Sequence, residues 1–386
     1  MGRVEGRADR AMKGSQDVRD IAQKVETGRR LSFEDGIRLF ASRDLHEIGR
    51  LADFVRRRKN GGVAYYVVNS HINYTNYCML RCKFCGFAVP YGQGADEGYE
   101  LSVEQVVERA RQAHADGATE VHIVGGLHPR LPFEYYVEMI RGIRQQCPGV
   151  HIKAFTAVEV LHLSRMARPR LSVAEVLERL RQAGLDSLPG GGAEIFDHRV
   201  QAQGFRHKAG RDDWFDVHRI AHEMGIPSTA TMLYGHIETP AQRIGHLIQL
   251  RRHQDASLAA RRAHFQCLVP LPFVPGGSAW SHLPGPTGLD SLKTLAIARL
   301  MLDNVAHVKA FWPMLSVKLA QVALGFGVDD LDGTVTRYEV TRRDGVSPDQ
   351  QALTVDELRR LILQAGYIPV QRDSLYRPVR PDEPGA

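Results

Sequence analysis

The chain has 386 residues, of which 43% are hydrophobic and 24% charged, and its formal net charge is +6 at pH 7. These proportions are close to those of an average globular protein, so they exclude a chain that is disordered throughout. No unbroken apolar stretch is long enough to span a bilayer, and the arginine-rich residues 1–15 lack the apolar core of a secretory signal, so we expect a cytoplasmic protein without a membrane span.

The positive charge leaves three kinds of partner open: nucleic acid, a membrane surface or an acidic small substrate. Many basic residues stand near acidic ones, and the basic run at 56–59 follows the helical pattern of a helix end. The sequence contains no recognisable nucleic-acid-binding module. We therefore predict no nucleic-acid partner.

Residues 17–60 are predicted to form two or three helices. Leu45, Ile48, Leu51, Ala52 and Val55 recur at helical spacing and mark one apolar face. We predict that residues 1–60 are an N-terminal helical extension that caps the domain after it.

Strands and helices alternate from residue 61 onwards. Ser102, Ser172, Thr239 and Thr354 each stand three residues before a Glu or Gln, a capping box that starts a helix. Apolar or β-branched runs predict strands at 63–72, 121–124, 150–155, 185–188, 226–233, 264–271, 308–312 and 335–339. Eight such strands predict an α/β fold, a (β/α)8 TIM-type barrel over 61–340, with a C-terminal helix and mobile tail over 341–386.

The most distinctive pattern follows the first predicted strand, where Cys78, Cys82 and Cys85 form a CxxxCxxC motif. A closed zinc site and most electron-transfer iron–sulfur clusters use four protein ligands. Three thiolates on a four-iron cluster leave one iron free for a ligand that is not protein. A zinc ribbon needs a fourth ligand, and His71 lies within the predicted strand. The remaining cysteines, at 147 and 267, stand alone and are not assigned to the cluster.

The motif, with the aromatic Phe84 before its last cysteine, resembles the signature of radical S-adenosylmethionine (SAM) enzymes. The resemblance implies a [4Fe-4S] cluster on the three cysteines, with a free iron that chelates the amino and carboxylate groups of SAM. One electron then cleaves SAM to a 5′-deoxyadenosyl radical. The resemblance also places Phe84 near the adenine, with packing beneath the loop as the plain alternative.

Further residues match the SAM contacts of the superfamily by their position. Gly125 and Gly126 follow the second strand, where the superfamily has a glycine-rich turn that meets the methionine amino group. Glu159 follows the third strand, and we assign it to the ribose hydroxyls, with a surface carboxylate as the alternative. Glu194 and Glu238 follow the fourth and fifth strands and suit either a site or a helix cap.

A longer resemblance covers most of the chain, over segments 71–76, 122–129, 151–159, 185–194, 230–240, 307–312 and 372–376. These segments are similar to the aminodeoxyfutalosine synthase family of the futalosine route to menaquinone. The resemblance implies that the radical adds to the enol-ether double bond of 3-[(1-carboxyvinyl)oxy]benzoate. The implied products are 6-amino-6-deoxyfutalosine, methionine and bicarbonate, and the implied electron donor is a flavodoxin or ferredoxin.

A dianionic substrate needs cations or hydrogen-bond donors at the mouth of the barrel. The candidates on strand ends and adjoining loops are His128, Arg130, Lys153, His236 and Lys309, and we single out His128, Lys153 and His236 as catalytic. Each has a plain alternative, because histidines also serve as surface or packing groups and a lysine can cap a carbonyl.

One segment departs from the family pattern. Between residues 334 and 354 the family has a Glu, a downstream His and an Ala-Gly pair, whereas this chain has only Glu339 as a counterpart. The nearest alternative function is dehypoxanthinylfutalosine cyclase, whose radical abstracts hydrogen and leaves as 5′-deoxyadenosine. A ring-coupling enzyme of deazaflavin biosynthesis is more distant. From another class, a zinc protein that binds nucleic acid would be separated by iron and sulfide analysis.

Overall fold

The computed structural model describes residues 18–92, 97–341 and 351–379. The strands in this part of the chain pair with one another only in parallel. Their bounds are β1 Val63–Val67, β2 Asn69–Ile72, β3 Glu120–Ile123, β4 His151–Ala154, β5 Ser228–Tyr234, β6 Phe265–Pro272, β7 His307–Val308, β8 Asp330–Gly333 and β9 Ile368–Gln371.

Helices follow most of the strands, as the sequence pattern predicted. Residues 18–26 are helical, and Leu324–Phe326 form the 3-10 helix η1. The other helices are α2 Phe33–Ala41, α3 Leu45–Asn60, α4 Val103–Ala115, α5 Phe133–Gln146, α6 Ala157–Met166, α7 Val173–Ala183, α8 His198–Gly204, α9 Arg211–Glu223, α10 Pro240–Ala259, α11 Gly288–Met301, α12 Trp312–Leu315, α13 Val317–Ala323 and α14 Val355–Gln364.

The strands form three parallel sheets, in the orders β8-β1-β9, β2-β3-β4 and β5-β6-β7. Isolated parallel bridges join Lys153 to Ser187, Leu188 to Ser228, and Lys309 to Asp330. The predicted strand at 185–188 is therefore present only as these bridges. The predicted strand at 63–72 is divided into β1 and β2.

Two strand predictions near the C-terminal end are corrected. Of the run at 308–312, Val308 ends β7 and Lys309 adds one bridge, because Phe311 is already the N-cap of α12. The run at 335–339 forms no regular strand: only Thr336 pairs, through an isolated parallel bridge to Ser70, and β8 precedes the run. Val335 and Arg337 have φ values of 48° and 61°, a left-handed backbone that a strand does not contain.

All four predicted helix starts are confirmed. In each capping box the Ser or Thr side chain accepts a hydrogen bond from the amide three residues later, and the Glu or Gln side chain accepts one in return. Two further boxes begin α2 at Ser32 and α6 at Thr156. Short local hydrogen bonds thus determine where six helices begin.

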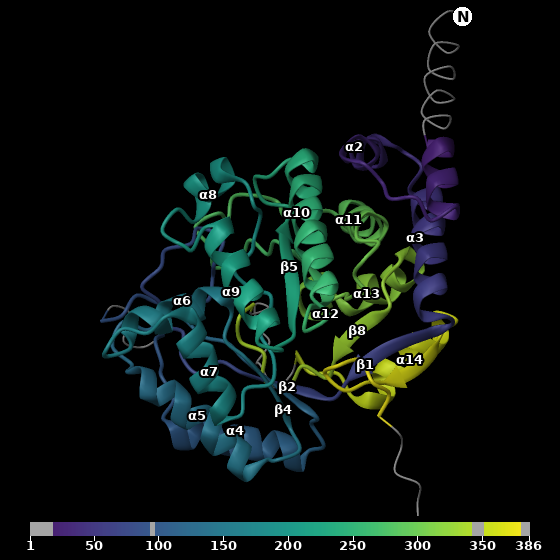
Figure 1. Cartoon of the computed structure of the whole chain (residues 1–386). Coiled ribbons are helices and arrows are strands. Elements are labelled where there is room, and N and C mark those ends of the chain that lie inside the picture. The colour runs from purple at the N-terminus through teal and green to yellow at the C-terminus, as the bar shows by residue number, and fades with distance from the viewer. Residues whose placement is uncertain (1–17, 93–96, 342–350, 380–386) are drawn as a thin grey trace, which may run out of the picture.

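Figure 1 shows α4, α5, α7, α9, α10 and α11 arranged around the strands. Their apolar faces form the core: Val106 of α4, Ile140 of α5 and Leu177 of α7 are fully buried. Burial of each such side chain contributes about 1.5–3 kcal/mol. Because the helices occupy the outer side of the strands, the inner side is left for a central cavity.

The N-terminal helices occupy the outside of this arrangement. Helix α3 packs along α11 and against η1, and α2 packs against α10 and α11; Figure 1 shows α2 and α3, in purple, beside α11. None of their described residues lines the central cavity. Residues 18–60 are thus largely helical, but their helices cover outer helices instead of capping the cavity; residues 1–17 of the predicted extension lie outside the described residues.

The C-terminal segment contributes more than a helix and a tail. After α14, β9 pairs in parallel with β1, with Val63 opposite Ile368. The next residues turn inward, where Arg372 and Ser374 are 1% and 2% exposed. Of the predicted mobile tail, residues 380–386 lie outside the described residues, whereas residues up to 379 are placed in the fold. In the described part of the chain no helix is both long and apolar enough to cross a membrane.

Candidate active site

A cavity of about 300 Å³ lies at the carboxyl ends of the strands. Its walls come from the loops that follow β2, β3 and β4 and from residues of β5, β6 and β8. Eight of the ten predicted site residues line it: Cys78, Cys82, Phe84, Cys85, Gly125, Gly126, Lys153 and Glu159. The other two, His128 and His236, do not.

The three cysteines of the motif are free and half-buried on one wall of the cavity. The Sγ of Cys78 already accepts hydrogen bonds from the amides of Leu80 and Leu127, at 3.4 and 3.3 Å. Burial raises the pKa of Cys82 to about 12 and also raises the pKa of Cys85, so these thiols need a positive partner to ionise. Iron supplies that charge, and the donor set of three sulfurs fits an iron–sulfur cluster.

No three His, Cys, Asp or Glu side chains among the described residues are grouped closely enough to hold a single metal ion. Beside the cysteines, Phe84 lies edge-to-face with Phe205, with ring centroids 5.7 Å apart. The ammonium of Lys208 lies 5.1 Å from the Phe84 ring centroid and forms an ion pair with Glu194. Lys208, which the sequence interpretation missed, therefore brings a cation to the cluster loop.

The two predicted glycines are required by close packing within the protein. A Cβ on Gly126 would lie 2.2 Å from the carbonyl oxygen of Tyr77, and a Cβ on Gly125 would lie 2.6 Å from the Tyr74 ring. Any larger residue would push this loop away from the cysteine loop. The two glycines thus let the loop after β3, called the glycine loop below, pack against the segment that carries the cysteines.

Glu159 is not a surface carboxylate, and both of its oxygens accept hydrogen bonds from the protein. It is 3% exposed, and its Oε2 accepts hydrogen bonds from the amide and hydroxyl of Thr156, at 2.8 and 2.7 Å. Its Oε1 accepts from the Tyr74 hydroxyl at 2.8 Å and from the Gly125 amide at 3.0 Å. With four protein donors, this carboxylate positions the glycine loop.

Two lysines reach the floor of the cavity, each paired with a buried carboxylate. Lys153 Nζ lies 2.6 Å from Glu120 Oε2, and Lys309 Nζ lies 2.7 Å from Asp332 Oδ1. The ammonium of Lys153 keeps the pKa of Glu120 well below its usual value, although burial opposes it. Both pairs are therefore charged, and each lysine retains further N–H donors.

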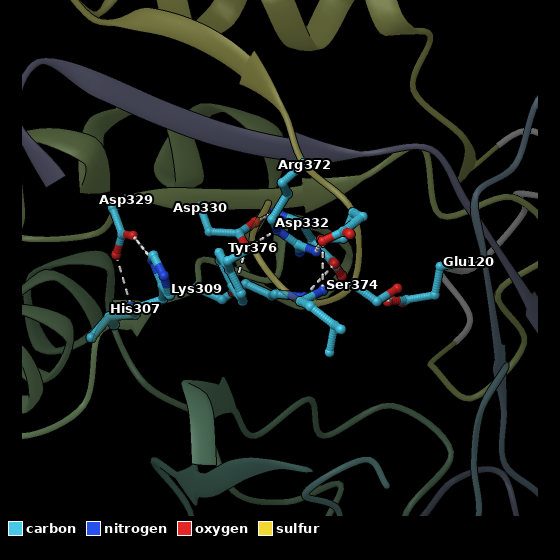
Figure 2. Close-up of polar contacts among 12 residues, drawn as sticks. Glu120, His307, Lys309, Asp329, Asp330, Asp332, Arg372, Ser374 and Tyr376 are labelled. Atoms are coloured by element: carbon cyan, nitrogen blue, oxygen red, sulfur yellow. Dashed lines mark hydrogen bonds and ion pairs between the residues drawn. The ribbon is translucent and has the colours of Figure 1, made fainter. Parts of the chain in front are cut away.

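The C-terminal segment supports this floor from below. Figure 2 shows Ser374 beside Glu120, and Arg372 and Tyr376 beside Asp330. The Ser374 hydroxyl donates to Glu120 Oε2 at 2.6 Å, and Asp330 Oδ2 accepts from Arg372 Nε at 2.7 Å and from the Tyr376 hydroxyl at 2.6 Å. The Ser374 contact fixes the carboxylate that holds Lys153, and the other two contacts fix Asp330 of β8.

Comparison with known families agrees with this geometry. Residues 72–250 match the model of the radical SAM superfamily, and residues 264–383 match the model of the CofH/MqnC C-terminal region. The chain is 45% identical to an aminodeoxyfutalosine synthase of Thermus thermophilus, over 96% of this chain and 98% of that protein. It is 41% identical to the aminodeoxyfutalosine synthase of Streptomyces coelicolor, over 94% of each chain.

The chain belongs to the aminodeoxyfutalosine synthase family. It is therefore a radical SAM enzyme, and its cofactors are a [4Fe-4S] cluster and SAM. A more distant relative is the 5-amino-6-(D-ribitylamino)uracil–L-tyrosine 4-hydroxyphenyl transferase of Methanopyrus kandleri, 36% identical over 96% of this chain and all of that protein.

Two solved structures have the same fold as this member of the aminodeoxyfutalosine synthase family. Methylornithine synthase matches with a TM-score of 0.70 and 18% identity, over 90% of this chain and 96% of that chain. The FeFe-hydrogenase maturase HydG of Carboxydothermus hydrogenoformans matches with a TM-score of 0.69 and 16% identity, over 97% and 84%. At these identities the likeness concerns the fold alone.

His128 does not face the cavity in this family member, which corrects the prediction from sequence. Its Nδ1 accepts hydrogen bonds from the amides of Arg130 and Leu131, at 3.1 and 3.0 Å, and its Nε2 lies 2.7 Å from Glu100 Oε2. Arg130 also lies outside the cavity, with its guanidinium 4.7 Å above the Tyr91 ring. Because both ring nitrogens contact protein groups, the imidazole stabilises the turn after β3.

His236 is likewise a structural residue. Its ring stacks on Trp280 at a centroid distance of 5.5 Å, and its Nε2 lies 3.2 Å from the carbonyl oxygen of Leu233. Glu238 accepts hydrogen bonds from the His236 amide, at 2.9 Å, and from Arg243 Nε, at 2.7 Å. The loop after β5 is thus held by turn and helix contacts, the alternative weighed from the sequence.

Two histidines and a carboxylate on the cavity lining were not predicted as site residues: His71, His122 and Asp332. Both histidines lie within strands, and the sequence signal that could have found them is a polar ring in an otherwise apolar run. Glu339, the proposed counterpart in the divergent segment, does not line the cavity, and its carboxylate lies 3.5 Å from Arg109 Nη1.

Proposed function

We propose that this enzyme adds a SAM-derived 5′-deoxyadenosyl radical to 3-[(1-carboxyvinyl)oxy]benzoate, with 6-amino-6-deoxyfutalosine, methionine and bicarbonate as products. The observation that carries the proposal is that one cavity is lined both by the three cysteines and by Lys153 and Lys309. When bound, the cluster and SAM supply the radical. The names of the two relatives above support this choice of substrate.

The residues of the cavity suit a dianionic substrate and a reactive carbon radical. Lys153 and Lys309 provide ammonium donors for carboxylates beyond those used by Glu120 and Asp332. A primary radical abstracts hydrogen from most groups it meets, so water and stray donors must be excluded. The apolar part of the lining serves this purpose: Val124, Val158, Val269, Leu271 and Phe311.

We infer that the parallel strands close into a barrel around this cavity. The parallel bridges from Lys153 to Ser187, from Leu188 to Ser228 and from Lys309 to Asp330 each join a neighbouring pair of segments, and β8 pairs with β1 in parallel. A closed ring of strands leaves no edge exposed to water. It would also keep the radical inside a walled chamber.

We further infer that the electron donor is a small acidic carrier such as a flavodoxin or ferredoxin. A second cavity of about 290 Å³ shares Cys82 with the first and is lined by Arg81, Lys83 and Arg206. A basic surface beside a cluster ligand attracts an acidic protein and brings its redox group close to the iron. An oxygen-sensitive cluster also requires a reducing compartment, which favours the cytoplasm.

Anaerobic incubation of the reconstituted enzyme with SAM, a reductant and the enolpyruvyl benzoate tests the function, with the products read by mass spectrometry. We expect a product that contains the adenosyl mass, absent with Cys82→Ala and retained with Cys147→Ala, since Cys147 is buried outside the cavity. Free 5′-deoxyadenosine in a yield equal to the substrate consumed would instead identify a hydrogen-abstracting enzyme and contradict the proposal.

A further inference from the structure

We propose that His71, His122 and Lys153 form a subsite on the cavity floor that binds the ring carboxylate of the substrate. This inference rests on the proposed function and adds to it the residues that select a benzoate over an uncharged ring.

The three side chains form one row across neighbouring strands. In the parallel sheet β2-β3-β4, His71 is the register partner of His122, and His122 is the register partner of Lys153. All three residues line the cavity. The two imidazoles are stacked, with ring centroids 4.6 Å apart and planes 11° apart. The row is therefore a single polar surface built by strand register.

The row lies deeper in the cavity than the cluster loop. Alternate residues of an extended chain face the same side. His122 and Val124 therefore both point into the cavity, and His122 lies one step further from the carboxyl end of the strand. Gly125 and the cysteines follow the strand ends, on the side of Val124. Glu120, which pairs with Lys153, lies two residues before His122 in β3, one step further still from the cysteines.

The chemistry of the substrate orients it along this axis. The carbon that the radical attacks is the terminal methylene of the vinyl group, so the methylene must face the cluster end. The vinyl carboxylate is attached to the adjacent carbon and stays near that end. The ring carboxylate lies at the opposite end of the molecule, which places it toward the floor.

The row offers imidazole nitrogens that no protein group uses. Within the described residues, His122 has no hydrogen-bonding partner and is partly exposed to the cavity, and the Nε2 of His71 is buried without a partner. Burial, with the His71 imidazole and the nearby Lys153, holds the pKa of His122 well below its usual value, so its ring is neutral and carries one N–H donor and one acceptor nitrogen. Unpaired imidazole N–H groups beside the Lys153 ammonium, which can only donate, favour a ligand that accepts, such as a carboxylate.

The test compares two substrates in the holoenzyme: the enolpyruvyl benzoate and 2-phenoxyacrylate, which lacks the ring carboxylate. His122→Phe keeps the stacked ring and removes the donor. We expect it to weaken apparent binding of the benzoate, measured as KM, by about tenfold or more. Binding of 2-phenoxyacrylate, measured as the inhibition constant against the benzoate, should change by less than about twofold. His122→Gln, which restores an N–H donor, should regain most of the selectivity.

Two controls separate misfolding and a wrong function from a wrong subsite. The SAM-induced change in the electron paramagnetic resonance spectrum of the reduced cluster should persist in His122→Phe. His253→Phe, a half-buried ring on α10 outside the cavity, should leave both constants unchanged. Benzoate selectivity is the ratio of the 2-phenoxyacrylate inhibition constant to the KM of the benzoate. If this ratio is the same in wild type and His122→Phe while the adduct still forms, this inference is overturned. No adduct in wild type would instead overturn the proposed function.

Discussion

At the scale of single residues, Glu159 joins a helix start to the glycine loop of the active site. It is the last residue of the capping box of α6, and the same carboxylate accepts hydrogen bonds from Gly125 and Tyr74. Burial raises the pKa of Glu159, while these hydrogen bonds favour its charged form. The residue that the resemblance assigned to the ribose of SAM therefore ties the loop after β3 to Tyr74, in the segment before the cysteines.

Glu159→Gln should destabilise the protein because the side-chain NH2 group of Gln replaces a carboxylate oxygen. That NH2 group cannot accept the hydrogen bonds that the surrounding protein groups donate. We expect a loss of about 1–3 kcal/mol in the free energy of unfolding. Glu175→Gln changes the same position of the exposed capping box of α7, and we expect it to cost under about 0.5 kcal/mol. Urea unfolding of the two variants provides the measurement, and similar losses would show that the contacts to Gly125 and Tyr74 contribute nothing.

At the scale of elements, the segment after β9 supports the floor of the cavity. Arg372 and Asp330 are 1% and 0% exposed at their side chains and form an ion pair at 2.7 Å. The Tyr376 ring stacks on His307, with centroids 3.6 Å apart. A segment that looks like a tail in the sequence thus places charges beneath the lysines of the site.

Arg372→Met should leave Asp330 buried without its cation. Breaking such a pair costs about 3–5 kcal/mol, so we expect a large fall in the melting temperature. Arg377→Met provides the matched control, because Arg377 is 73% exposed and pairs with Asp373 on the surface. That pair is expected to contribute under about 1 kcal/mol. A small effect of Arg372→Met on the melting temperature would refute a structural role for the segment after β9.

At the scale of the whole molecule, several buried histidines make the fold sensitive to acid. Burial lowers the pKa of His222 and of His246 to about 3. An unfolded chain restores the ordinary histidine pKa of about 6.5. Between these values the unfolded state binds more protons than the folded state, so stability is complete above about pH 6.5 and falls as the pH decreases toward 3.

Each of these histidines should lower the free energy of unfolding by about 1.4 kcal/mol for every pH unit below about 6.5. His246→Gln cannot titrate, so its melting temperature should fall less than that of wild type between pH 7.5 and pH 5.5. The visible absorbance of the cluster, recorded in the same melt, separates loss of iron from unfolding. Parallel pH profiles for variant and wild type would argue against buried neutral histidines as the cause.

The cluster motif and the helix starts were determined by the sequence itself. Three cysteines within eight residues share one loop whatever the rest of the chain does, and a capping box is completed by residues three positions apart. The alternation of strands and helices likewise indicated the fold class, since hydrophobic periodicity is a local property. Interactions over such short distances are readable without tertiary structure.

Only the tertiary structure decided which polar residues face the cavity. From the sequence, His128 and His236 stood at strand ends and His71 and His122 within strands, yet the first two bond to nearby protein groups and the last two line the cavity. Glu159 also acquired partners from the loop after β3 and from the segment before the cysteines. Strand register and burial bring together residues far apart in the chain, and those long-range contacts decide which donors remain free for a ligand.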